Sequence, residues 1–227
     1  YRNNWLEKKK DSKKDDEKLY YNIRIILNKM SESNFEILYN EFIKFDIKTK
    51  KQLNYIIEMI YKKAVLEKTF SSLYANLINK LLPTYITEND EKIFFNNQMM
   101  EVFQKKFLEL MYKTEDDFRD PYKKKQYNGF IILLAELYNQ GGLDEKIICF
   151  CLKFLLNSIN EGDVQFIKLF CLFIEKIGNK LKEKNKNQFD IYFNNIKNLL
   201  NEKSINIKYK FPIQDLIEIN DKNNWKI

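Results

Sequence analysis

The sequence predicts an all-α protein built from antiparallel helix pairs. Apolar residues recur at helical spacing through most of the 227 residues. Glycine and proline are scarce, with five and three residues, whereas all-β folds need both at many turns. The helix pairs recur about every 40 residues, the period of HEAT-type repeats, and each pair is too small to fold alone. We therefore expect a HEAT-type α-solenoid of about five antiparallel helix pairs, with an irregular helical bundle as the alternative.

Each expected helix is defined by one apolar face. In the first, Leu19, Ile23 and Ile26 are followed by Leu27 and Met30, all on one side of an α-helix. The same pattern predicts helices over residues 19–30, 35–43, 53–64, 71–81, 93–111, 130–138, 147–155, 166–177, 189–200 and 211–219.

Capping and breaking residues mark the ends of these helices. Ser31 is expected to N-cap the second helix, and Pro83 to end the fourth. Gly141-Gly142 and Gly178 are expected to stop two later helices, and Pro212 to lie in a first turn. The expected connectors are a polar segment at 84–92 and an acidic-then-basic loop at 115–125.

The first 18 residues differ in composition from the rest of the chain. They are polar and rich in Lys and Asp, and their one anchor-like side chain is Trp5. We expect residues 1–18 to be a flexible charged leader and residues 19–227 to form a single HEAT-repeat domain.

The composition disfavours an enzyme and a metal site. The chain has no histidine, which removes the usual general base near neutral pH and the commonest metal ligand. Cys149, Cys151 and Cys171 lie in apolar runs and are expected to be small buried hydrophobes. No glycine-rich phosphate loop occurs, and the sequence contains no apolar run long enough to cross a membrane. We expect a binding module without cofactors.

The net charge of +7 favours an anionic partner. Three lysine clusters are candidate phosphate contacts, which would bind RNA independently of its sequence and in a salt-sensitive way. A solvated charged surface is the alternative for each. The candidates are Lys8, Lys9, Lys10, Lys123, Lys124, Lys125, Lys182, Lys184 and Lys186.

Five sequence strings occur in the order found in one protein family. They are ILNKMSESNF at 26–35, KAVLEKTFS with LYANL at 63–77, AELY with LDEKI at 135–147, IGNKL at 177–181, and KYKFPIQDLIEI at 208–219 followed by Trp225. Each string is weak alone, but together they are specific. Residues 19–227 thus resemble the middle domain of eukaryotic translation initiation factor 4G, whose fold of five HEAT repeats agrees with the pattern above.

The resemblance implies a translation initiation scaffold that is not an enzyme. Its expected partners are the RNA helicase initiation factor 4A, which it would activate, and mRNA. Initiation factor 3 is a further candidate partner. A cytoplasmic monomer without membrane contact is expected. The alternatives are a related middle-domain adaptor of mRNA processing or decay (nonsense-mediated decay, cap-binding or splicing) and a HEAT-type protein-interaction adaptor without RNA.

The resemblance also implies roles for particular residues. Those implied to bind the helicase are Trp5, Glu145, Lys210, Phe211, Gln214 and Asp215. Leu27, Met30 and Phe35 are implied to support helicase binding, as core residues acting through the fold. Two assignments have alternatives: Trp5 as an unanchored aromatic residue, and Phe211 as a core residue of the last repeat.

The sequence departs from the family's pattern at several points. Lys68 and Phe150 stand where the family has proline and an acidic residue, so part of an expected acidic contact set is missing. The loop at 113–126 is shorter than in many relatives, and Gly141-Gly142 replaces bulkier residues. Lysines replace arginines, which keeps the charge but loses the bidentate grip on phosphate or carboxylate.

Overall fold

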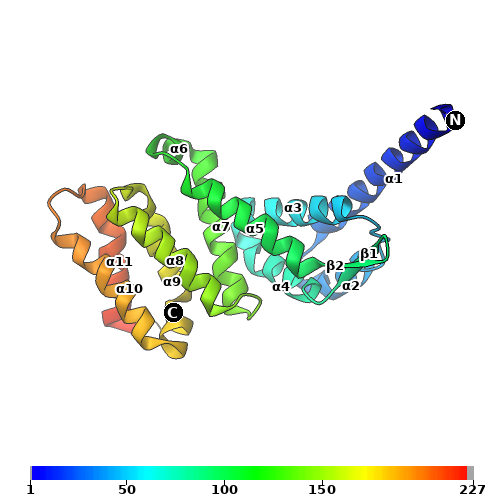
Figure 1. Cartoon of the computed structure of the whole chain (residues 1–227). Helices are drawn as coiled ribbons and strands as arrows, with labels where there is room; N and C mark the ends of the chain where they lie inside the picture. The colour runs from blue at the N-terminus through cyan, green and yellow to red at the C-terminus, as the bar shows by residue number, and fades with distance from the viewer. Residues whose placement is uncertain (1, 224–227) are drawn as a thin grey trace. The chain divides into compact units, whose positions relative to one another are not determined.

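A computed structural model describes the backbone of residues 2–223 and the side chains of residues 13–222 (Figure 1). The helices are α1 Arg2–Lys29, α2 Phe35–Phe42, α3 Lys50–Leu66, α4 Ser71–Leu81, α5 Phe95–Met111, α6 Glu115–Arg119, α7 Pro121–Asn139, α8 Glu145–Asn160, α9 Ile167–Lys184, α10 Lys186–Asn198 and α11 Ile207–Asn223. Two strands, β1 Tyr85–Glu88 and β2 Glu91–Phe94, form an antiparallel hairpin. Short 3₁₀ turns are η1 Glu32–Asn34, η2 Lys68–Phe70, η3 Val164–Phe166 and η4 Leu199–Asn201.

The predicted fold class, all-α with HEAT-type helix pairs, is confirmed. The described chain forms two compact units, Tyr1–Lys63 with Lys80–Lys106 and Ala64–Asn79 with Phe107–Ile227, here called the first and second units. The apolar faces predicted from the sequence form their cores, and each fully buried Leu, Ile or Phe side chain contributes about 1.5–3 kcal/mol of burial free energy.

In the first unit, α1 packs against α2, and polar contacts also join α1 to α3. Gln52 donates from Nε2 to Asp16 Oδ1 over 2.6 Å. The rings of Tyr20 and Tyr55 lie 4.0 Å apart between their centroids. These contacts hold α1 beside α3.

In the second unit, α9 is the central helix. It contacts α7, α8, α10 and α11, which surround it in Figure 1. Because neighbours lie on several sides, its buried residues spread around most of its circumference: Ile167, Leu169, Phe170, Cys171, Phe173, Ile174, Ile177, Gly178 and Leu181. Burial of Cys171 and of Cys151 on α8 agrees with the prediction that these cysteines are small buried hydrophobes. Cys149, also expected to be buried, is only half-buried.

The segment expected to be a flexible leader has a helical backbone, and its flexibility stays a prediction. Helix α1 begins at Arg2 and continues without a break through residue 18. The segment lacks glycine and proline, and its Lys, Glu and Asp residues are compatible with a helix. Asp16 also ties the later turns to α3. The domain boundary at residues 18 and 19 stays a prediction.

The polar connector expected at 84–92 is largely a β-hairpin. Asn89 and Asp90 form its two-residue turn, with φ of 51° and 66°. Asn and Asp tolerate this left-handed region better than other non-glycine residues, so this turn suits a two-residue hairpin. The side chains of Tyr85 and Phe94 pair across the strands, with ring centroids 5.5 Å apart.

The prediction of a loop at 115–125 is also wrong, because these residues form α6 and the first turn of α7. Asp117 accepts a hydrogen bond from the backbone N–H of Thr114 over 3.1 Å and closes the start of α6. Asp120 caps α7 by accepting from the N–H groups of Tyr122 and Lys123. Pro121 takes the first helical position, where its missing N–H costs nothing.

Two expected helix ends are also corrected. Gly178 does not end its helix, because α9 continues to Lys184 and buries Gly178 inside it. Helix α11 begins at Ile207, so Pro212 lies inside the helix rather than in its first turn. There it has no N–H to donate to the carbonyl of Lys208, one turn earlier.

Candidate functional site

The exposed face of α11 carries three of the predicted helicase-binding residues. Phe211, Gln214 and Asp215 are exposed and follow the i, i+3, i+4 spacing of one helix face. Ile213 and Leu216, on the opposite face, are buried. Phe211 is 55% exposed, so the alternative of a core residue in the last repeat is wrong. This face presents a large apolar side chain beside an amide and a carboxylate.

Lys210, also predicted to bind the helicase, is half-buried and turned toward its own chain. Its Nζ donates to the carbonyl oxygens of Leu200 and Glu202 over 2.7 and 2.8 Å. These carbonyls lie at the end of η4, where backbone acceptors lack helical partners. The Lys210 ammonium therefore joins α11 to the end of η4.

Glu145 is the first residue of α8 and is half-buried. Its carboxylate accepts a hydrogen bond from Asn185 Nδ2 over 2.8 Å, and the Oδ1 atom of Asn185 caps α10. Burial, with a smaller contribution from the Glu145 charge, raises the pKa of Tyr138 to about 12. Glu145 thus links the starts of α8 and α10.

Phe150 replaces the second acidic position expected on α8. Its ring is 57% exposed and lies 5.7 Å from the ring of Phe154 and 6.5 Å from that of Phe107, between centroids. Aromatic surface therefore stands where the resemblance implies a second carboxylate.

The three residues implied to support helicase binding are buried in the first unit. Leu27, Met30 and Phe35 are 1%, 5% and 5% exposed. Such burial leaves them no direct contact with a partner and fits a role through the fold. Trp5, Lys8, Lys9 and Lys10 lie in the part of α1 whose side chains are outside the described residues.

The remaining candidate RNA-binding lysines differ in whether their ammonium groups already contact other side chains. Lys123 is paired with Asp117 over 2.7 Å and holds the pKa of that carboxyl at about 2. Lys182 donates to Asn220 over 3.2 Å, and Lys184 lies 5.9 Å from the centre of the Tyr138 ring. The other three are exposed at helix starts: Lys124, Lys125 and Lys186.

Of these lysines, Lys124 lines a cavity with cations that the sequence did not group. The cavity has a volume of about 100 Å³ and lies in the second unit between α6, α7, α9 and α11. Its other cationic side chains are Arg119, Lys168 and Lys208. These four cations are spread over 89 positions of sequence, from Arg119 to Lys208, and only folding brings them together.

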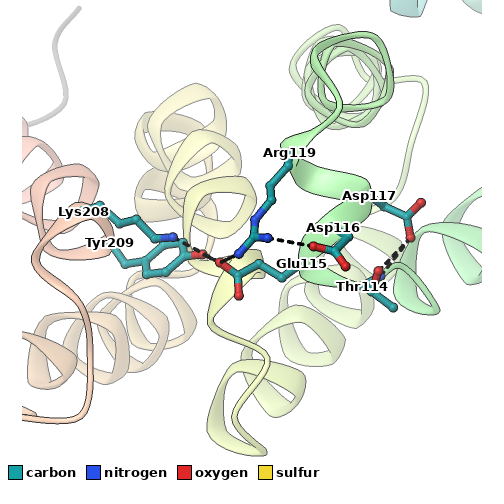
Figure 2. A network of polar contacts seen from close by, with 7 residues as sticks. All are labelled: Thr114, Glu115, Asp116, Asp117, Arg119, Lys208 and Tyr209. Carbon is teal, nitrogen blue, oxygen red and sulfur yellow. Dashed lines mark hydrogen bonds and ion pairs between the residues drawn. The ribbon is translucent and has the colours of Figure 1, made fainter.

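Glu115 organises this cavity. Its Oε1 atom accepts from Lys208 Nζ over 3.1 Å and from the Tyr209 hydroxyl over 3.3 Å (Figure 2). Arg119 lies 3.8 Å from the same oxygen and donates to Asp116 over 2.9 Å. The hydrogen bond from Lys208 is the main cause of a Glu115 pKa below its ordinary value. Glu115 thus fixes α6 against the start of α11.

The described part of the chain contains neither a metal-binding cluster nor a membrane-spanning helix. No group of three or more His, Cys, Asp or Glu side chains in it could hold a metal ion. Nor does any of its helices combine the length and apolarity needed to cross a membrane.

Comparisons with known proteins agree on one family. The MIF4G domain model matches residues 21–223. Eukaryotic translation initiation factor 4G of Triticum aestivum is 29% identical over 225 residues, covering 90% of this chain and 15% of that protein. Eukaryotic translation initiation factor 4 gamma 1 of Mus musculus is 27% identical over 237 residues, covering 91% and 14%. This chain therefore spans about a seventh of these relatives.

A solved structure gives the same fold. The MIF4G domain of translation initiation factor EIF4G5 of Trypanosoma cruzi matches with a TM-score of 0.55 and 19% identity, covering 92% of this chain and 97% of that one. The family model accounts for most of the chain and the relatives are translation initiation factors. The chain belongs to the MIF4G domain family, as a middle domain of the initiation factor 4G type.

Proposed function

We propose that this domain binds the RNA helicase initiation factor 4A, activates it, and contacts RNA without catalysing a reaction itself. The proposal places this work in the cytoplasm, with the domain acting as a monomer. Initiation factor 3 is a further proposed partner. Membership in a family of translation initiation scaffolds supports a scaffold role in translation initiation. The exposed groups on this chain support binding of the helicase and of RNA.

The observation that carries the helicase proposal is the exposure of Phe211. A phenylalanine that is 55% exposed on α11 gains little burial free energy from the fold of this chain. Buried against a partner, such a ring would supply a large contact area and would be flanked by Gln214 and Asp215. The family resemblance of the KFPIQD string gives this position its implied partner.

Activation would follow from differential affinity. A scaffold that touches both lobes of a two-lobed helicase stabilises the arrangement that fits it best, here a conformer poised to close on ATP and RNA. In the proposed arrangement, the C-terminal helices hold one lobe and the N-terminal end, with Trp5, holds the other. The domain then changes the population of helicase conformers rather than the chemistry of ATP hydrolysis.

Isothermal titration calorimetry of this domain with purified initiation factor 4A tests the helicase proposal. We expect saturable binding that Phe211→Ala weakens about tenfold or more, a loss typical of a buried aromatic contact. Ile191→Ala is the matched control, because Ile191 is a similarly exposed apolar residue, 52% exposed, on a different helix, α10. Absence of binding by the folded wild-type domain would reject the helicase proposal and leave a HEAT-type adaptor with another partner.

A further inference from the structure

We propose that the cavity between α6, α7, α9 and α11 is a phosphate-binding site for the backbone of single-stranded RNA. Lys124 and Lys168 would supply its unpaired charge, beside Lys208. This inference rests on the RNA contact in the proposed function and gives that contact a location. Arg119 is the fourth cation of the lining, and the neutral side chains of Tyr209 and Asn128 also line the cavity.

The charges at the cavity are unbalanced. Lys208 is paired with Glu115, and Arg119 with Asp116. Among the described residues, by contrast, no carboxylate lies within ion-pair distance of Lys124 or Lys168. Two ammonium groups are thus left without counter-charge at one cavity, which is the arrangement that favours an incoming anion.

The lysines are close enough to repel one another. The pKa of Lys168 lies below its ordinary value, first because of partial burial and then because of the charges of Lys124 and Lys208. A bound phosphate would offset both effects, since a negative charge near an ammonium favours its protonated form. The fold therefore holds these cations together at a cost that an anion reduces.

Tyr209 is a positioning residue in this arrangement. Lys208 Nζ lies 4.7 Å and Lys168 Nζ 5.7 Å from the centre of its ring, and its hydroxyl donates to Glu115. Cation–π attraction at these distances keeps both ammonium groups beside the ring. Because the ring is engaged with lysines, the cavity offers charge rather than a surface for stacking a base.

The free cations of the cavity suit a ligand that is recognised by charge rather than by bidentate geometry. Arginine holds carboxylate and phosphate alike in bidentate geometry, and Arg119 is already paired with Asp116. The unpaired cations are lysines, which bind phosphate as point charges. A phosphate backbone also presents repeated single charges without requiring a particular base sequence.

The test is fluorescence anisotropy of a labelled single-stranded RNA with the wild-type domain and with Lys168→Gln and Lys124→Gln. Lys153→Gln is the matched control, because Lys153 is an exposed lysine on α8 that does not line the cavity. Thermal unfolding of each variant verifies that it is folded. We expect both cavity variants to weaken RNA binding several-fold and each to reduce the slope of log affinity against log salt concentration by about 0.7, the value for one single-strand phosphate contact.

Each other outcome contradicts the inference in a different way. Equal affinities for Lys168→Gln, Lys124→Gln and Lys153→Gln would reject the cavity while leaving RNA contact to other lysines. Failure of the wild-type domain to bind RNA would reject the cavity and the RNA contact together, without touching helicase binding, which calorimetry measures without RNA. If calorimetry shows that inorganic phosphate binds wild type but not Lys168→Gln, while both bind RNA equally, the cavity is a site for free phosphate rather than for RNA.

Discussion

The Oε1 atom of Glu115 lies 3.1 Å from the Nζ atom of Lys208, a residue 93 positions later in the chain. Glu115 opens α6 and Lys208 lies in the first turn of α11, so this ion pair joins two elements of the second unit across the cationic cavity (Figure 2). The pair orients Lys208 and Tyr209 and leaves the charge of Lys168 unmatched.

The pKa of Glu115 should depend on Lys208. Because the hydrogen bond from Lys208 lowers this pKa below its ordinary 4.5, Lys208→Gln should raise it toward that value, as measured by NMR titration of the carboxyl carbon. A depressed folded-state pKa stabilises the fold above pH 4.5, and this contribution is lost as the pH falls through the folded-state pKa. Lys222→Gln, which removes the partner of Glu218, should leave Glu115 unchanged. An unchanged Glu115 titration in Lys208→Gln would contradict the ion pair.

Gly129 on α7 should not tolerate alanine. A Cβ atom there would stand 1.9 Å from the carbonyl oxygen of Val65, a backbone atom that cannot move aside cheaply. Gly129→Ala should lower the free energy of unfolding by about 3 kcal/mol in urea denaturation. In the control Gly141→Ala, the Cβ meets no atom within 4 Å and only the positive φ of 86° is unfavourable, which costs about 1 kcal/mol. Equal losses in the two variants would mean that α7 does not approach Val65 this closely.

Lys210 should affect helicase binding by stabilising the fold rather than by contacting the helicase. Lys210→Gln removes an ammonium that donates to two carbonyl oxygens, so the free energy of unfolding should fall by about 1.5 kcal/mol. Lys203→Gln, at an exposed neighbouring lysine, should change it by less than about 0.5 kcal/mol. Denaturation in urea measures both. If Lys210→Gln is as stable as wild type but loses helicase binding, the residue contacts the helicase directly.

Leu27 should support helicase binding only indirectly. Its side chain is 1% exposed, so Leu27→Ala should cost about 3 kcal/mol of unfolding free energy. Ile37→Ala, at a side chain that is 65% exposed, should cost less than about 0.5 kcal/mol. At a temperature where both variants are folded, calorimetry should give both the wild-type affinity for initiation factor 4A. Weak binding by the folded Leu27→Ala domain would contradict a purely structural role.

The sequence predicted the helices whose one-sided apolar pattern reports burial directly, such as the face formed by Leu19, Ile23 and Ile26. It missed elements whose signals are short. Asn89 and Asp90 provided a hairpin turn signal within a polar segment, and Thr114 with Asp117 provided a helix-capping pattern within a charged loop. Because both segments are polar, the sequence pattern predicts connectors there rather than a hairpin and a helix.

The candidate site was harder to predict because exposure and pairing depend on tertiary packing. Phe211 reads equally well as a core or a surface residue until α11 is placed, and the structure puts its ring outside. Likewise, nothing in the sequence joins Lys124 to Lys168 or Lys208, since they lie on three different helices. Charge runs such as Lys123–Lys125 mark candidate contacts, but only packing shows which lysines are already paired.

The most direct test of the central claim measures the ATPase activity of initiation factor 4A with RNA as this domain is titrated in. Wild type should stimulate the activity saturably, and Phe211→Ala should need a higher concentration for the same effect while unfolding as cooperatively as wild type. Ile191→Ala should match wild type. Absence of stimulation by the folded wild-type domain, or equal stimulation by Phe211→Ala, would contradict a helicase-activating scaffold that acts through the α11 face.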